Sequence, residues 1–152
     1  MNLLLNEIIE PFIEIAGFEE RVLSYEGEDV EAIVDKDKIR ELMIILLDNA
    51  LKYTNINDTI NVTLKNGLFD AIIEVSDTGI GISEETKEKI FERFYREDKA
   101  RSRGTGGNGL GLSIAKTIVT DLKGKISVDH NEPKGTKFLI VIPKAKKNVD
   151  NN

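Results

Sequence analysis

The stretch DKDKIRELMIILLDNALKYT, residues 35–54, carries the strongest pattern in the chain. Apolar side chains recur in it at the spacing of a helix that buries one face. They are Ile39, Leu42, Met43, Leu46, Leu47 and Ala50. Asp35 is a suitable N-cap, and the polar run at residues 55–58 ends the pattern. We therefore predict a buried amphipathic helix whose last turn carries polar side chains.

The segment before this helix is less regular. Residues 2–16 show helical spacing that Pro11 interrupts, which predicts a first helix with a kink or a late start. Two short β-branched stretches, at residues 21–25 and 31–34, flank a polar connection that contains Gly27. This arrangement predicts a hairpin.

The segment after the helix alternates between strands and helices. Residues 59–64 and 71–75 predict an antiparallel pair, with 71–75 as a central strand. A helix is expected to begin near Ser83, where the early turn is acidic. Between residues 93 and 111 the chain is charged and rich in glycine, which predicts a long functional loop. A last helix over residues 110–122 and a strand pair follow, and that pair comprises residues 125–128 and 136–142.

These elements predict an α+β fold. Three main helices would cover one face of a mixed, mostly antiparallel sheet of about six strands, giving a two-layer α/β sandwich. A chain of 152 residues fits one domain, which we place at residues 1–143, followed by a polar tail at 144–152.

The composition excludes several classes of function. The formal net charge is −6, which argues against a nucleic-acid surface, and no apolar run approaches the roughly 18 residues of a membrane span. We therefore expect a cytoplasmic domain without membrane contact. The chain has no cysteine and a single histidine, His130, which excludes disulfides, thiol nucleophiles and His-pair metal sites within it.

Three segments carry residues suited to chemistry. In the first, Asn49, Lys52 and Tyr53 share one helical face, where an amide oxygen suits Mg²⁺ and a lysine suits phosphate. The alternative is an ordinary helix end with Asp48 and Lys52 paired. In the second, Asp77 lies where an apolar strand meets a Gly-x-Gly turn. It could accept a hydrogen bond from the adenine amine or could simply cap the turn.

The third segment, residues 107–116, places glycines directly before a helix, where free backbone N–H groups favour an anion. Residues 104–109 match G-x-G-x-x-G, but a charged run precedes them in place of a hydrophobic strand. The Rossmann interpretation therefore fails, and no Walker A sequence is present.

Taken in order, these segments resemble the catalytic and ATP-binding domain of sensor histidine kinases, within the GHKL superfamily. Residues 46–54 resemble its N box, 77–82 its G1 box, 91–96 its F box and 107–112 its G2 box. Residues 135–138 resemble part of its terminal strand pair. The resemblance covers nearly the whole chain and implies the Bergerat-type ATP-binding fold.

The resemblance implies roles for individual residues. Asn49 would bind Mg²⁺, Lys52 and Tyr53 would contact the phosphates and nucleotide, and Asp77 would bind the adenine amine. Residues 92–108 would form a mobile lid over ATP. The other implied nucleotide-binding residues are Gly79, Gly81, Ile82, Gly107, Gly109, Leu110, Gly111 and Thr136.

Arg96 and Glu41 are the implied catalytic residues. Arg96 would reach the γ-phosphate, and Glu41 matches a position of the N box that is linked to phosphotransfer, although a solvated helix residue is an equal alternative. Ile45 departs from the family, which usually has asparagine there, whereas related hydrolases have a glutamate that activates water. We therefore expect little ATP hydrolysis. Isoleucine also cannot bind a metal, so Ile45 could weaken metal binding as well.

The phosphoacceptor motif of the family is absent, and His130 is interpreted as a loop residue. The resemblance thus implies transfer to a histidine on a separate dimerisation domain, in the same parent protein or in trans, and indirectly to a response regulator. One alternative is an anti-sigma-factor serine kinase of the same superfamily. Another is an interaction module that binds nucleotide without transfer. A GHKL hydrolase fits less well.

Overall fold

The structure, a computed structural model, describes residues 1–95 and 110–144. Its helices are α1 (Asn2–Phe18), α2 (Lys36–Lys52), α3 (Glu84–Lys89) and α4 (Gly111–Asp121). Its strands are β1 (Val22–Gly27), β2 (Thr59–Asn66), β3 (Asp70–Asp77), β4 (Lys125–His130) and β5 (Thr136–Pro143).

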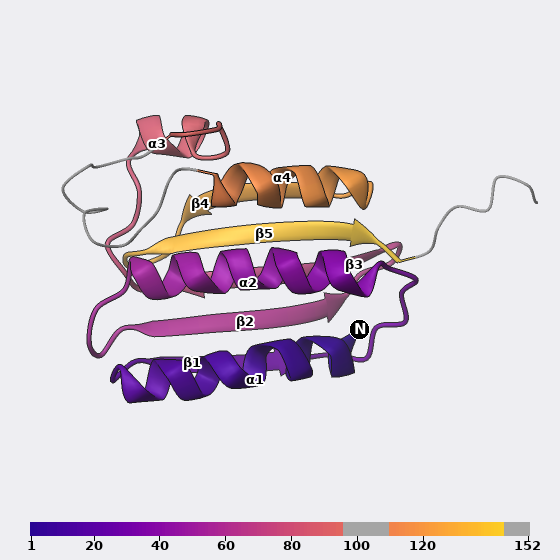
Figure 1. Cartoon of the computed structure of the whole chain (residues 1–152), viewed down its shortest axis with the longest axis horizontal. Helices are drawn as coiled ribbons and strands as arrows, with labels where there is room; N and C mark the ends of the chain where they lie inside the picture. Colours follow the sequence, from indigo (N-terminus) through magenta and orange to yellow (C-terminus); the bar gives the residue numbers. More distant parts are fainter. Residues whose placement is uncertain (96–109, 145–152) are drawn as a thin grey trace, which may run out of the picture.

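The five strands form one mixed sheet in the order β1-β2-β3-β5-β4. β1 pairs with β2 in parallel, and the other three pairs are antiparallel. Figure 1 shows α1, α2 and α4 side by side over one face of this sheet, with the short α3 at one end. The predicted α+β sandwich is therefore confirmed, and β3, which contains residues 71–75, is its central strand.

The core lies between the helices and the sheet. Every second residue of β2, β3 and β5 is buried, and these side chains face the helices. All six apolar residues predicted for the buried face of α2 are at most 2% exposed. Asp35 caps α2 as predicted, because its side chain accepts hydrogen bonds from the backbone N–H groups of Asp37 at 3.0 Å and Lys38 at 3.3 Å.

The predicted hairpin before α2 is wrong. Residues 31–34 form no strand, and β1 pairs with β2 in parallel instead. Two parallel neighbours need a crossover, and α2 supplies it. The segment before α2 therefore carries the chain from the sheet edge back to the helix layer, with Val30 buried and the Ile33 N–H bonded to the Lys144 carbonyl. The described part of the chain thus has five strands, against about six expected.

No helix in the described ranges combines the length and the apolar character needed to cross a membrane.

The core prediction is testable within α2. Replacing the fully buried Leu46 by alanine should lower the free energy of unfolding by about 2–5 kcal/mol, because the substitution removes buried methyl groups and leaves a cavity. Ile44 is 39% exposed on the same helix, so Ile44→Ala should cost less than about 1 kcal/mol. Urea unfolding measures both, and equal losses would contradict this assignment of the buried face.

Candidate functional site

Asp77 lies at the point where the sheet ends beneath the helices. It is the last residue of β3, and Thr136 is the first residue of the neighbouring β5. The two residues are 5% and 6% exposed. One carboxylate oxygen of Asp77, Oδ1, accepts hydrogen bonds from the backbone N–H of Gly79 at 2.9 Å and of Thr136 at 3.3 Å. No described residue donates to the other oxygen, Oδ2, which leaves it able to accept from a ligand.

Burial raises the pKa of the Asp77 carboxyl from its ordinary 3.8 to about 6, since a buried charge loses its hydration. The two backbone hydrogen bonds oppose this shift, and the negative charge of Asp58 adds to it. At neutral pH the group is therefore mostly ionised. A buried, ionised carboxylate with an open oxygen is a strong acceptor for an amine.

The last turn of α2 meets the Asp77 turn through backbone. The carbonyl of Tyr53 accepts a hydrogen bond from the N–H of Ile80 at 3.2 Å. A Cβ at Gly79 would overlap that same carbonyl, so only glycine fits there. Asn49, Lys52 and Tyr53 are all half-buried on this turn. The structure therefore brings the first two predicted segments together.

The turn between β4 and β5 packs against the backbone of Asp77. The side-chain amide of Asn131 donates to the Asp77 carbonyl at 2.8 Å. Gly135 has φ +110°, and a Cβ there would overlap the Asp77 carbonyl. Sequence reasoning missed Asn131 and used Gly135 only as part of a strand motif, because neither contact can be read from local spacing.

The third segment also reaches this end of the molecule. α2 and α4 run antiparallel, since Lys38 near the start of α2 lies 3.6 Å from Asp121 at the end of α4. At the other end, a Cβ at Gly111 would lie 3.6 Å from the Ile45 methyl carbon Cγ2. The N-terminus of α4, where the first N–H groups of a helix have no partner within the helix itself, therefore lies beside the C-terminal half of α2.

Glu41, Ile45 and Asn49 follow one another at four-residue spacing and so share one face of α2. Ile45 is partly buried and packs against the core, whereas Glu41 is exposed. Ile45, where the sequence differs from the family, therefore has a packing role: its side chain lies against Gly111, the first residue of α4. It has no atom that could bind a metal ion.

The F box is anchored to the same region. The Phe91 ring lies 6.2 Å from the Phe138 ring in an edge-to-face arrangement, and Lys116 of α4 lies 5.7 Å from the Phe91 ring centre. Ile82 is half-buried beyond Gly81, which has φ +77°. Arg96, Gly107 and Gly109 lie outside the described residues, as does most of the predicted lid.

His130 takes part in a surface cluster between β4 and α3. Its Nε2 lies 2.6 Å from Glu84, and Lys87 lies 3.1 Å from Asp129. The side chains of these pairs are 31–75% exposed, as is usual for ion pairs on a protein surface.

Among the predicted site residues, Asn49 is the side chain predicted to hold a metal ion. Within the described ranges, no group of three or more His, Asp or Glu side chains could hold an ion. A single amide such as Asn49 suits Mg²⁺, which keeps water ligands and binds substrate phosphates.

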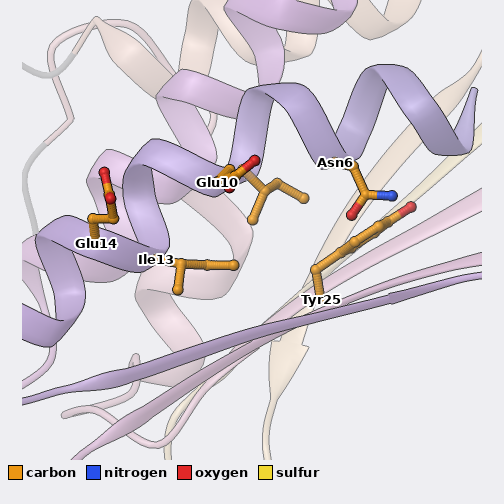
Figure 2. Close-up of a pocket in the computed structure, with 6 residues that line it drawn as sticks. Asn6, Glu10, Ile13, Glu14 and Tyr25 are labelled. Carbon is orange, nitrogen blue, oxygen red and sulfur yellow. The ribbon is translucent and has the colours of Figure 1, made fainter.

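A groove of about 370 Å³ lies elsewhere, between α1 and β1. Figure 2 shows Ile13 and Tyr25 directed between the helix and the strand, with Glu10 and Glu14 on the helix. None of the three predicted segments lines this groove.

Comparisons with known proteins agree with this arrangement. The family described as histidine kinase-, DNA gyrase B-, and HSP90-like ATPase matches residues 34–146. The sensor protein CiaH of Streptococcus pneumoniae is 49% identical over 129 residues, which is 84% of this chain and 29% of CiaH. This chain spans less than a third of the length of the curated relatives that it matches.

Solved structures give the same result. The catalytic domain of the histidine kinase ThkA has a TM-score of 0.82 and 31% identity, covering 95% of this chain and 93% of that domain. ThkA in complex with the response regulator TrrA also matches, with a TM-score of 0.78 and 29% identity over 95% of this chain and 40% of that chain. The chain therefore belongs to the histidine kinase-, DNA gyrase B-, and HSP90-like ATPases, and within them to the catalytic domains of histidine kinases.

Proposed function

We propose that this domain binds Mg-ATP between Asp77, the last turn of α2 and the N-terminus of α4, and donates the γ-phosphate to a histidine on a separate dimerisation domain. The observation that carries the proposal is the Asp77 carboxylate, which is buried with Oδ1 held by two backbone N–H groups. Its Oδ2 is left to accept from the adenine amine.

This geometry favours adenine over guanine. The exocyclic amine of adenine donates a hydrogen bond, whereas guanine presents a carbonyl oxygen at the equivalent position. Two acceptors facing each other in a buried site would repel, which penalises GTP. Gly79 and Gly81 leave room for a planar base close to the backbone, and Ile82 and Thr136 border the same turn.

The phosphates would lie toward α2 and α4. Lys52 supplies a positive charge, and the helix dipole at the N-terminus of α4, which begins at Gly111, favours an anion. Asn49 would hold Mg²⁺ together with phosphate oxygens, and the ion neutralises phosphate charge when bound. Tyr53 would contact the nucleotide. By resemblance, Gly107 and Gly109 would contact the phosphates and Arg96 would reach the γ-phosphate.

The acceptor histidine is proposed to come from outside this chain. Phosphoryl transfer depends on positioning and electrostatic stabilisation, so the domain's task is to hold ATP and present its terminal phosphate. The relatives of this chain support this direction, since CiaH is a sensor protein and ThkA is found in complex with the response regulator TrrA. A response regulator is therefore the proposed indirect partner.

The first experiment is calorimetric titration with Mg-ATP and Mg-GTP. Asp77→Asn should weaken ATP binding by about a hundredfold or more, because an amide nitrogen would face the adenine amine. The free energy of unfolding at pH 7 should not fall, since the substitution removes a buried charge. Asp70→Asn, at the opposite end of β3, is the matched control and should bind as wild type. Unchanged affinity in Asp77→Asn would remove Asp77 from this role.

A pH dependence follows from Asp77. Because folding raises its pKa to about 6, the folded protein binds an extra proton below that pH. Relative to Asp77→Asn, wild type should gain up to about 3 kcal/mol of unfolding free energy as pH falls from 7 to 4. ATP affinity should fall over the same interval, since the protonated group is a poorer acceptor. Urea unfolding and calorimetry across pH measure the two trends, and parallel stability curves for the two proteins would contradict the assignment.

Transfer itself is tested with γ-labelled ATP and a histidine-bearing dimerisation hairpin. The hairpin should acquire an acid-labile, alkali-stable label, as expected of a phosphorylated imidazole. Asn49→Ala should abolish labelling, and Asp70→Asn should preserve it. An acid-stable label would indicate a serine kinase, whereas ATP binding without any label would favour the interaction module.

A further inference from the structure

Asp58 joins the two loops that frame the proposed adenine site. It lies between α2 and β2 and is 9% exposed. Its Oδ2 accepts a hydrogen bond from the Asn55 N–H at 2.7 Å, and its Oδ1 accepts one from the Thr78 hydroxyl at 3.2 Å. Thr78 follows Asp77 directly. One carboxylate thus bonds both to its own loop, beyond the last turn of α2, and to the turn that carries Asp77.

Thr78 extends this connection into the sheet. Its hydroxyl accepts a hydrogen bond from the Thr59 N–H at 3.0 Å while donating to Asp58. Its backbone N–H donates to the Thr59 carbonyl at 3.1 Å. The hydroxyl therefore has a fixed direction, because its proton goes to Asp58 and its lone pair to Thr59. Such a closed network restrains the turn at residues 77–79.

The charge of Asp58 also acts on Asp77. It is a secondary cause of the raised pKa of the Asp77 carboxyl, after burial. Lys134, on the turn between β4 and β5, approaches Asp58 Oδ1 at 3.9 Å, but its side chain is 62% exposed. An exposed lysine at that distance neutralises a buried carboxylate only weakly.

We propose that Asp58 is a positioning residue of the nucleotide site, which holds the turn at residues 77–79 through Thr78 so that Asp77 faces the adenine amine. This inference rests on the proposed ATP binding. Asparagine at position 58 has one acceptor oxygen in place of two, so it cannot accept from both the Asn55 N–H and the Thr78 hydroxyl. The Thr78 hydroxyl proton would then lose its acceptor, and the turn would lose the bond that Asp58 accepts from it.

The test combines ATP calorimetry at pH 8 with an amide NMR titration of the ATP-free domain. Gly79 and Thr136 donate to Asp77, so their amide shifts report its ionisation. Asp58→Asn should weaken ATP binding by about tenfold and move the titration midpoint to lower pH, because a neighbouring negative charge is lost. Exposure of Asp77 by an opened turn would also lower the midpoint, because burial is the main cause of its raised pKa, so Thr78→Val is needed to separate the two effects.

Three further variants separate the effects. Thr78→Val removes the hydroxyl but leaves the Asp58 charge, so ATP binding should weaken while the midpoint does not move to lower pH. Thr78→Ser keeps the hydroxyl and should behave as wild type, as should the control Asp70→Asn. If Asp58→Asn fails to fold, the Val and Ser pair decides the question: equal ATP affinity in both would overturn the proposal.

The outcomes remain distinct from those for the proposed function. Wild-type ATP affinity at pH 8 in Asp58→Asn would overturn the role of Asp58 while leaving ATP binding intact. If wild type itself bound no ATP, the proposed function would fail. The NMR titration would then still test whether Asp58 acts on Asp77. An unchanged midpoint in Asp58→Asn would overturn that action, and a midpoint lowered in Asp58→Asn but not in Thr78→Val would support it.

Discussion

The site depends on keeping one ionised carboxylate, that of Asp77, inside an apolar interface between helices and sheet. Such a charge is costly unless hydrogen bonds compensate for lost hydration. Here backbone N–H groups of Gly79, in the turn after β3, and of Thr136, at the start of β5, do so. Both donors bond to Oδ1, so the compensation leaves Oδ2 open. The pKa of about 6 reflects a balance in which burial outweighs these bonds yet the group stays ionised at neutral pH.

The surrounding backbone is shaped by the same requirement. Gly79 and Gly135 approach carbonyl groups so closely that a side chain at either position would overlap them. The turns after α2, β3 and β4 therefore meet around Asp77 with little space between them. Close packing of this kind transmits small displacements. In the inference above, this is how Asp58, which holds Thr78, affects the position of the Asp77 carboxylate that would accept from adenine.

Sequence alone could predict the parts that local periodicity encodes. The buried face of α2, its Asp35 cap and the central position of residues 71–75 all follow from spacing and propensity. Residues 31–34 were misassigned because β-branched composition cannot distinguish a strand from a crossover segment. Asp58 and Asn131 were missed for a related reason: their hydrogen-bond partners lie 20 and 54 residues away. Only the assembled turns bring them together.

Ile45 shows how packing and chemistry combine at one position. A domain that passes a phosphoryl group to another protein must hold ATP without losing it to water. Isoleucine has no group that can activate water, and here its methyl lies against the start of α4, close to where the phosphates are proposed to bind. The apolar contact that joins α2 to α4 thus also removes a possible base from the phosphate end. In the proposed function, transfer then waits for an imidazole supplied by the acceptor domain.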